Sequence, residues 1–159
     1  MPKNKVFAMK PLRATLALLF LMPAVSYAAL YEGMERDVCF KNQSNIHIAY
    51  DCLSKKTAES SHALDNIIAE TNKQIKINNP GPVFRSEDPK LTIGDIYSKS
   101  FLAAQVDWKA YRENLCLAVA SQIGEDANDY QSYIDQCVIN LNKRHVEEIK
   151  MMDIKSGHN

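Results

Sequence analysis

The sequence predicts an all-α fold, a small disulfide-stapled helical bundle of three main helices plus a short N-terminal Cys-bounded segment. Three stretches carry apolar residues at helical spacing, with charged and amide residues on the opposite face. Strand-like alternation does not persist anywhere in the chain, and all four cysteines follow an N-terminal apolar run. These observations favour a single helical domain with covalent cross-links.

Residues 1–28 have the features of a secretory signal peptide. The apolar run 14–22 is too short for a membrane span and ends at Pro23. Ser26 and Ala28 provide the small residues that a cleavage site requires. The basic residues of this leader are Lys3, Lys5, Lys10 and Arg13. We expect cleavage after Ala28 and an exported mature domain of residues 29–159.

The charge of the mature chain excludes some classes of partner. The whole chain has 19 Lys and Arg residues and 19 Asp and Glu residues. The leader holds four of the bases and no acid, which leaves the mature chain at −4. Such a chain is a poor candidate for nucleic acid or anionic membranes, and no membrane span follows the leader. The charge suits a cationic protein partner or serves ordinary solubility.

All four cysteines belong to the mature chain, which predicts two disulfides in an exported protein. Four cysteines allow three pairings, and neighbours in sequence are the simplest, Cys39–Cys52 and Cys116–Cys137. Each bridge would stabilise the fold by about 3 kcal/mol in the loop-entropy model. The chain has neither a CxxC nor an HExxH motif, so we expect no metal and no other cofactor.

The helical pattern places the elements in order. A turn or short helix is expected in 38–52, followed by a helix from Leu53 to about Ile77. The apolar face of that helix is Leu64, Ile67, Ile68, Thr71 and Ile75. Prolines and asparagines then make 78–90 a loop. A second helix runs from the nineties to about Ile123, and a third from about Asn128 to Met152. The apolar side of the third is Ile134, Cys137, Val138, Leu141, Val146 and Ile149.

The second helix mixes unusual residue types on one stripe. Gln105, Trp108, Arg112 and Cys116 recur at spacings of three or four. The apolar stripe beside them is expected to be Tyr97, Phe101, Ala104, Trp108, Tyr111, Leu115 and Val119. A buried Arg is costly unless paired. We therefore expect Arg112 to bond helix-end carbonyls or a carboxylate of a neighbouring segment, and Gln105 to bond backbone of the N-terminal segment. A ligand site is the alternative interpretation.

The sequence has no recognisable catalytic motif, so we do not expect the chain to be an enzyme. Ser61, His62 and Asp65 are close in sequence, but residues one apart on a helix point in different directions. His145 and Glu148 provide at most half of a metal site. Glycine-rich phosphate loops are absent as well.

The second helix resembles the signature of the LprI-like lysozyme-inhibitor family. The matching pattern is Leu102, Ala104, Gln105, Trp108, Tyr111, Arg112 and Cys116. Cys39 and Cys52 match two cysteines that precede the motif in that family, and Cys137 with Arg144 matches a later Cys and Arg. The resemblance covers nearly all of the mature chain. The loop 78–90 is longer and richer in proline than the family pattern suggests.

The resemblance implies a periplasmic protein that binds a lysozyme or another cell-wall hydrolase and blocks its muramidase activity. An inhibitor must place a donor near the catalytic carboxylates of such an enzyme. Arg85 and Ser86 in the proline-rich loop are our candidates for that insertion, and the alternative for this loop is a plain surface connection. Two other functions stay open: an immunity protein against a cell-wall-degrading toxin, and a non-inhibitory envelope binding protein.

Overall fold

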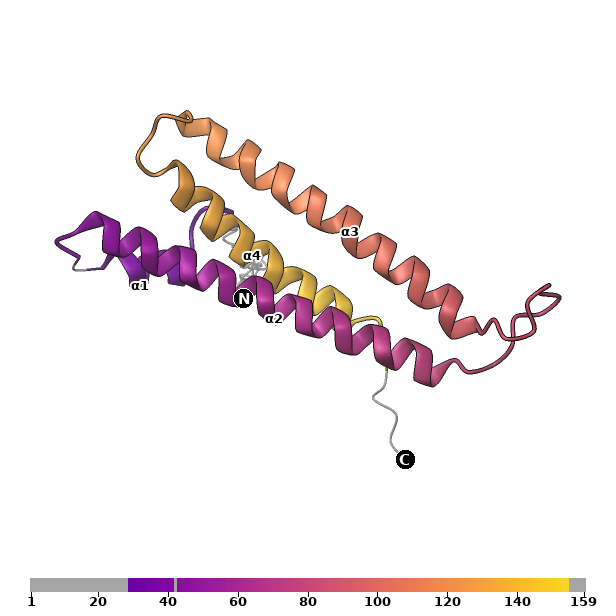
Figure 1. Ribbon diagram of the computed structural model, residues 1–159. Coiled ribbons are helices and arrows are strands. Elements are labelled where there is room, and N and C mark those ends of the chain that lie inside the picture. Colours follow the sequence, from indigo (N-terminus) through magenta and orange to yellow (C-terminus); the bar gives the residue numbers. More distant parts are fainter. Residues whose placement is uncertain (1–28, 42, 155–159) are drawn as a thin grey trace, which may run out of the picture.

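The computed structural model describes residues 29–41 and 43–154 and shows a bundle of long helices (Figure 1). In chain order these are α1 (Met34–Phe40), α2 (Ile46–Asn78), α3 (Ile93–Ala120), the 3₁₀ helix η1 (Ser121–Ile123) and α4 (Tyr130–Lys150). No strand occurs in the described ranges, so the predicted all-α class is confirmed. The expected leader, 1–28, lies outside the described residues.

The ends of the two longest helices are set by polar caps. The Asn45 side chain accepts a hydrogen bond from the His47 backbone N–H and starts α2. Thr92 and Asp95 form a reciprocal capping box that starts α3. Because α2 begins at Ile46, the prediction of a start near Leu53 was wrong by about two turns. The missed signal was the Asn45 cap, which lies in the segment assigned to a turn or short helix.

Both predicted disulfides are present, and each joins two helices. Cys39 of α1 is bonded to Cys52 of α2, and Cys116 of α3 is bonded to Cys137 of α4. Their Cα–Cα distances are 5.6 and 5.5 Å. Both bridges lie within clusters of buried apolar side chains. Helix α2 packs against α3 and α4, so the two covalently tied pairs form one bundle.

The core-facing side of α3 differs from the predicted stripe. Gln105, Arg112 and Cys116 are buried, whereas Tyr111 is 55% exposed and Ala104 is also exposed. The prediction that Tyr111 and Ala104 are core residues was therefore wrong. Trp108 is half-buried and packs against two of the three apolar clusters. Because the disulfide at Cys116 faces α4, the side of α3 that carries Gln105 and Arg112 also faces α4. Tyr111 then lies at the surface.

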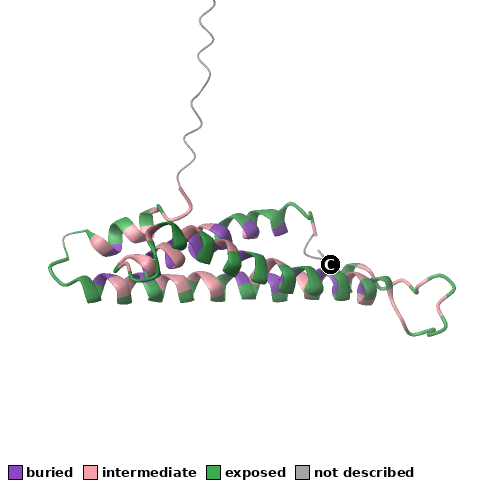
Figure 2. Cartoon of the chain, turned by 90° about the horizontal axis from the view of Figure 1, so that it is seen from above, coloured by how far each residue is buried: buried purple, intermediate pink, exposed green. Residues whose placement is uncertain are grey.

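Two segments lie outside the main helices. The N-terminal segment is held along α4 by Tyr31, whose ring stacks on Tyr133 with centroids 4.3 Å apart. The loop 79–92 projects beyond one end of the bundle (Figures 1 and 2). Among the described residues, no helix combines the length and apolar character needed to cross a bilayer.

Candidate functional site

Gln105, Trp108 and Arg112 of the α3 motif form a polar layer with α4. The His145 ring stacks on Trp108, with centroids 3.8 Å apart and planes 8° from parallel. His145 Nε2 lies 2.7 Å from Gln105 Oε1, and His145 Nδ1 lies 2.8 Å from Glu148 Oε2. Both ring nitrogens of the buried His145 therefore have a hydrogen-bond partner within the chain, as burial requires.

Arg112 forms the other half of the layer. Its Nη1 donates to Asn142 Oδ1 at 2.8 Å, and Asn142 Nδ2 donates to Ser60 Oγ at 3.2 Å and to Ser61 Oγ at 3.3 Å. The guanidinium also lies 5.6 Å from the centre of the Trp108 ring. Only Arg112 Nε is buried without a hydrogen-bond partner among the described residues. The layer thus connects three helices through one guanidinium and one amide.

The partners of Gln105 and Arg112 differ from those predicted. Gln105 bonds His145 of α4, so the expected bond to the N-terminal backbone was wrong. Arg112 bonds the Asn142 amide and, at 3.5 Å, Glu113 of its own helix. It does not reach helix-end carbonyls or a carboxylate of another segment. The cause is the Cys116–Cys137 bridge, which brings the amide side of α4 against this part of α3.

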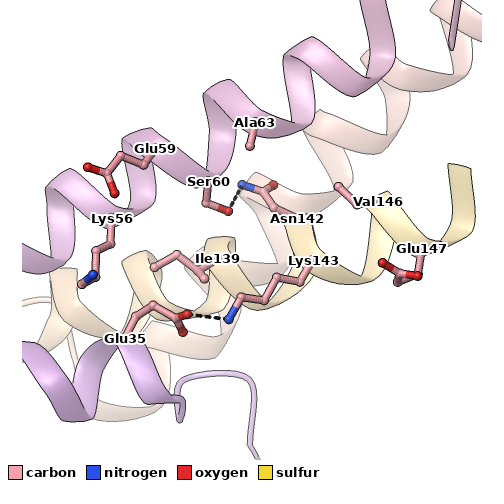
Figure 3. A pocket seen from close by; sticks show the side chains of 10 residues that line it. All are labelled: Glu35, Lys56, Glu59, Ser60, Ala63, Ile139, Asn142, Lys143, Val146 and Glu147. Atoms are coloured by element: carbon pink, nitrogen blue, oxygen red, sulfur yellow. Dashed lines mark hydrogen bonds and ion pairs between the residues drawn. The ribbon is translucent and has the colours of Figure 1, made fainter. Parts of the chain in front are cut away.

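A groove of about 390 Å³ opens beside this layer between α1, α2 and α4 (Figure 3). Its apolar floor is made by Ala63, Ile139 and Val146, next to the Ser60–Asn142 hydrogen bond. Charged residues of both signs surround the floor: Glu35, Lys56, Glu59, Lys143 and Glu147. The groove therefore offers a mixed-charge rim to solvent.

Glu35 is the most constrained carboxylate of that rim. Burial acts to raise the pKa of Glu35, but hydrogen bonds from Lys143 and Gln136 outweigh it, so the pKa lies below its usual value. Lys143 Nζ is 2.5 Å from Glu35 Oε1. This carboxylate is ionised and occupied at neutral pH, so it is an anchor between α1 and α4 and a poor general base.

The loop 79–92 is ordered by its own backbone. Val83 N–H donates to Leu91 O at 3.0 Å and Ile93 N–H donates to Gly81 O at 2.9 Å, so the two ends pair like a short hairpin. Gly94 lets α3 approach the end of α2, because a Cβ there would lie 2.9 Å from the Asn79 carbonyl oxygen. The loop is thereby fixed at both ends on rigid helices.

The tip of the loop presents an aromatic ring and a cation together. Phe84 is 84% exposed, and the Arg85 guanidinium lies 5.0 Å from its ring centre. Arg85 has a positive φ of 58°, and Ser86 N–H donates to Val83 O to close the turn. Ser86 Oγ accepts from the Asp88 N–H. Ser86 therefore orders the tip, whereas Arg85 is exposed to solvent.

The other sequence candidates lie apart from one another. Ser61 bonds Asn142, while the His62 ring lies 3.3 Å from Asn66, so a nucleophile–base pair does not form there. Asp65 pairs with Lys109. Arg144 is exposed on α4. Within the described ranges, no group of three or more His, Cys, Asp or Glu side chains is placed to hold a metal ion.

Two important residues were missed from the sequence. Phe84 is the most exposed large apolar side chain of the described residues. The signal in the sequence was an aromatic residue inside a proline-rich loop. Asn142 is the main partner of Arg112. The signal was an amide on the helix that the disulfide ties to α3, at a position able to face the buried guanidinium.

Comparison of the chain with family models, curated proteins and solved structures gave no match.

Proposed function

We propose that this chain is an exported inhibitor that binds a lysozyme-like muramidase and blocks its cleft with the loop 79–92. The observation that carries the proposal is the projecting, internally hydrogen-bonded loop with Phe84 and Arg85 at its tip. An ordered loop loses little conformational entropy when it binds. The LprI-like resemblance of α3 supports the same function independently of the loop.

The chemistry of the tip matches a muramidase cleft. Such clefts contain a pair of catalytic carboxylates, and a guanidinium binds carboxylate oxygens through two parallel hydrogen bonds. Phe84 provides an apolar face for the sugar-binding surface beside them, where an aromatic anchor contributes most of the affinity. The net charge of −4 for residues 29–159 favours approach to a cationic enzyme.

Export is part of this proposal. All four cysteines are paired, which fits a protein that folds in an oxidising compartment such as the periplasm. The leader predicts the N-terminus of the mature protein. N-terminal sequencing of the protein recovered from the periplasm should begin at Ala29, and recovery of the uncleaved chain from the cytoplasm would contradict export.

Inhibition is tested by lysis of bacterial cell walls with several lysozymes in a turbidity assay. We expect inhibition at micromolar protein, and a loss of at least tenfold for Phe84→Ala and for Arg85→Ala. Lys90→Ala is the matched control, because Lys90 is an exposed cation of the same loop. Absence of inhibition for every lysozyme tested would overturn the proposal. Inhibition confined to a bacterial cell-wall toxin would identify an immunity protein instead.

A further inference from the structure

The outer face of α3 carries a row of exposed residues, of which only Glu113 has a polar side-chain contact in the described part of the chain, at 3.5 Å from Arg112. Lys99, Leu102, Val106, Ala110 and Glu113 are all exposed. At 100° per residue they fall on one stripe, away from the buried Gln105 and Arg112. Leu102 is 41% exposed and Val106 is 68% exposed. Because α2 and α4 lie on the other side of α3, this stripe is left unpartnered within the chain (Figure 1).

The stripe is symmetric about Val106. Leu102 and Ala110 lie four residues on either side of it, and Lys99 and Glu113 lie seven residues on either side. The two charges at the ends are opposite in sign. Val106 is also at the middle of α3, which runs from Ile93 to Ala120. About a two-fold axis at Val106 each residue faces its mirror position on the other copy, so this pattern gives every residue of the stripe a complementary partner.

Antiparallel pairing satisfies every position of the stripe. Lys99 then faces Glu113 of a second copy, Leu102 faces Ala110, and Val106 faces Val106. Parallel pairing would place Lys99 against Lys99 and Glu113 against Glu113, which is repulsive. Small side chains at the centre allow the helix axes to approach closely. Both end residues are available: Glu113 has only a 3.5 Å contact with Arg112, and no ion pair of Lys99 is found in the described part of the chain.

We propose that α3 is a self-association surface, at which two copies of this chain pair antiparallel about a two-fold axis at Val106. The contact is bounded, since Asp95, which would face Leu117, is already bound by Thr92 and Lys76. The segment 99–113 is about 21 Å long at the rise of an α-helix. A contact of this length is small for a protein interface, so we expect a weak dimer that forms only at high protein concentration.

The proposal does not depend on the inhibitory function, although the two are compatible. Antiparallel pairing of α3 places the loops 79–92 of the two copies at opposite ends of the dimer. Neither loop is covered by the pairing. Failure of the dimer would leave the inhibitory proposal untouched, and failure of inhibition would leave the dimer untouched.

Sedimentation velocity of residues 29–159 between about 1 and 500 µM tests the pairing, with a dimer expected in the upper part of this range. Val106→Glu should weaken association at least tenfold, because two like charges would meet on the axis. Ile48→Glu on α2 is the matched control, since Ile48 is 54% exposed and lies outside the stripe. A wild-type monomer at every concentration, or an unchanged dimer for Val106→Glu, would overturn the proposal.

A charge exchange tests the antiparallel register. Lys99→Glu and Glu113→Lys should each weaken the dimer about tenfold, and the double variant should restore it to within about threefold of wild type. Restoration is specific to antiparallel pairing, and its absence would overturn the register. Oxidation of Val106→Cys gives a second measurement: it should yield a cross-linked dimer, whereas Ile48→Cys should not. Circular dichroism confirms that each variant is folded.

Discussion

The buried polar layer and the loop 79–92 use arginine in opposite ways. Arg112 is 9% exposed and donates to an amide at 2.8 Å, with Trp108 packed beside it. Arg85 is exposed, and within the described residues its ring contact is with its neighbour Phe84. Arg112 makes its hydrogen bonds inside the fold, whereas the Arg85 guanidinium is exposed to a partner. The buried motif residues Gln105 and Arg112 therefore hold the helices together, and the binding chemistry that we propose for inhibition lies in the loop.

Substitutions in the buried polar layer should cause the largest loss of stability. Asn142→Ala removes the 2.8 Å partner of the buried Arg112 guanidinium and leaves it only the 3.5 Å contact with Glu113, so we expect a loss of about 2–3 kcal/mol in the free energy of unfolding. Urea unfolding followed by the fluorescence of Trp108, the single tryptophan of the chain, measures it. Asn114→Ala, an exposed amide change on α3, should cost less than about 0.5 kcal/mol. Equal effects of the two variants would contradict this role of Asn142.

A substitution at the junction between the loop 79–92 and α3 should cause a loss of stability of intermediate size. Thr92→Ala removes the capping box at the start of α3, for which we expect a loss of about 1 kcal/mol. The bridge between Thr92 and Pro82 is made by backbone groups that the substitution keeps, so the loop should stay closed and inhibition should be largely unchanged. Thermal melts and the turbidity assay measure stability and inhibition separately. Ser100→Ala on the exposed side of α3 serves as the control for stability, and a large loss of inhibition by Thr92→Ala would show that the loop depends on the cap.

Another buried polar residue, Asp135, has fewer hydrogen bonds to its charged group than its burial requires. Burial raises the pKa of Asp135, and one hydrogen bond from Gln131 only partly offsets this. The raised pKa means that the charged form disfavours folding at neutral pH and that this penalty disappears below the unfolded pKa of about 4. Asp135→Asn should stabilise the protein by about 0.5–1 kcal/mol at pH 7.

The pH dependence of the stabilisation by Asp135→Asn tests whether it arises from ionisation of Asp135. Melting temperatures of Asp135→Asn and wild type should differ at pH 7 and converge near pH 3, where both side chains are neutral. The substitution keeps the oxygen that accepts from Gln131, so the geometry of the bond is retained. A gain that persists unchanged at pH 3 would show that it does not arise from ionisation.

The smallest stability effects should come from the exposed arginines. Arg85→Ala and Arg144→Ala should each change the free energy of unfolding by less than about 0.5 kcal/mol, since neither side chain is buried. They should differ in function, because only Arg85 lies in the proposed insertion. Paired melts and inhibition assays compare them, and a loss of inhibition by Arg144→Ala would move the binding surface to α4.

Much of the fold could be predicted from local patterns in the sequence. The all-α class followed from apolar spacing, and the limits of α3 and α4 followed from turn residues and periodicity within a few positions. Pairing of neighbouring cysteines was the simplest of three possibilities in the sequence, and the structure confirms it. The early start of α2 was missed because a cap of one asparagine is a weaker signal than a long apolar stripe.

The sequence by itself determined which helices form, which cysteines can pair, and that a guanidinium lies on a mostly apolar stripe. Only the tertiary structure decided the rotation of α3, and with it the burial of Gln105 and the exposure of Tyr111. That rotation depends on contacts between residues far apart in the chain, such as Arg112 with Asn142 and Cys116 with Cys137. Helical periodicity predicts a buried stripe on α3 of about the observed width. The contacts with α4 decide which residues lie at the centre of that stripe.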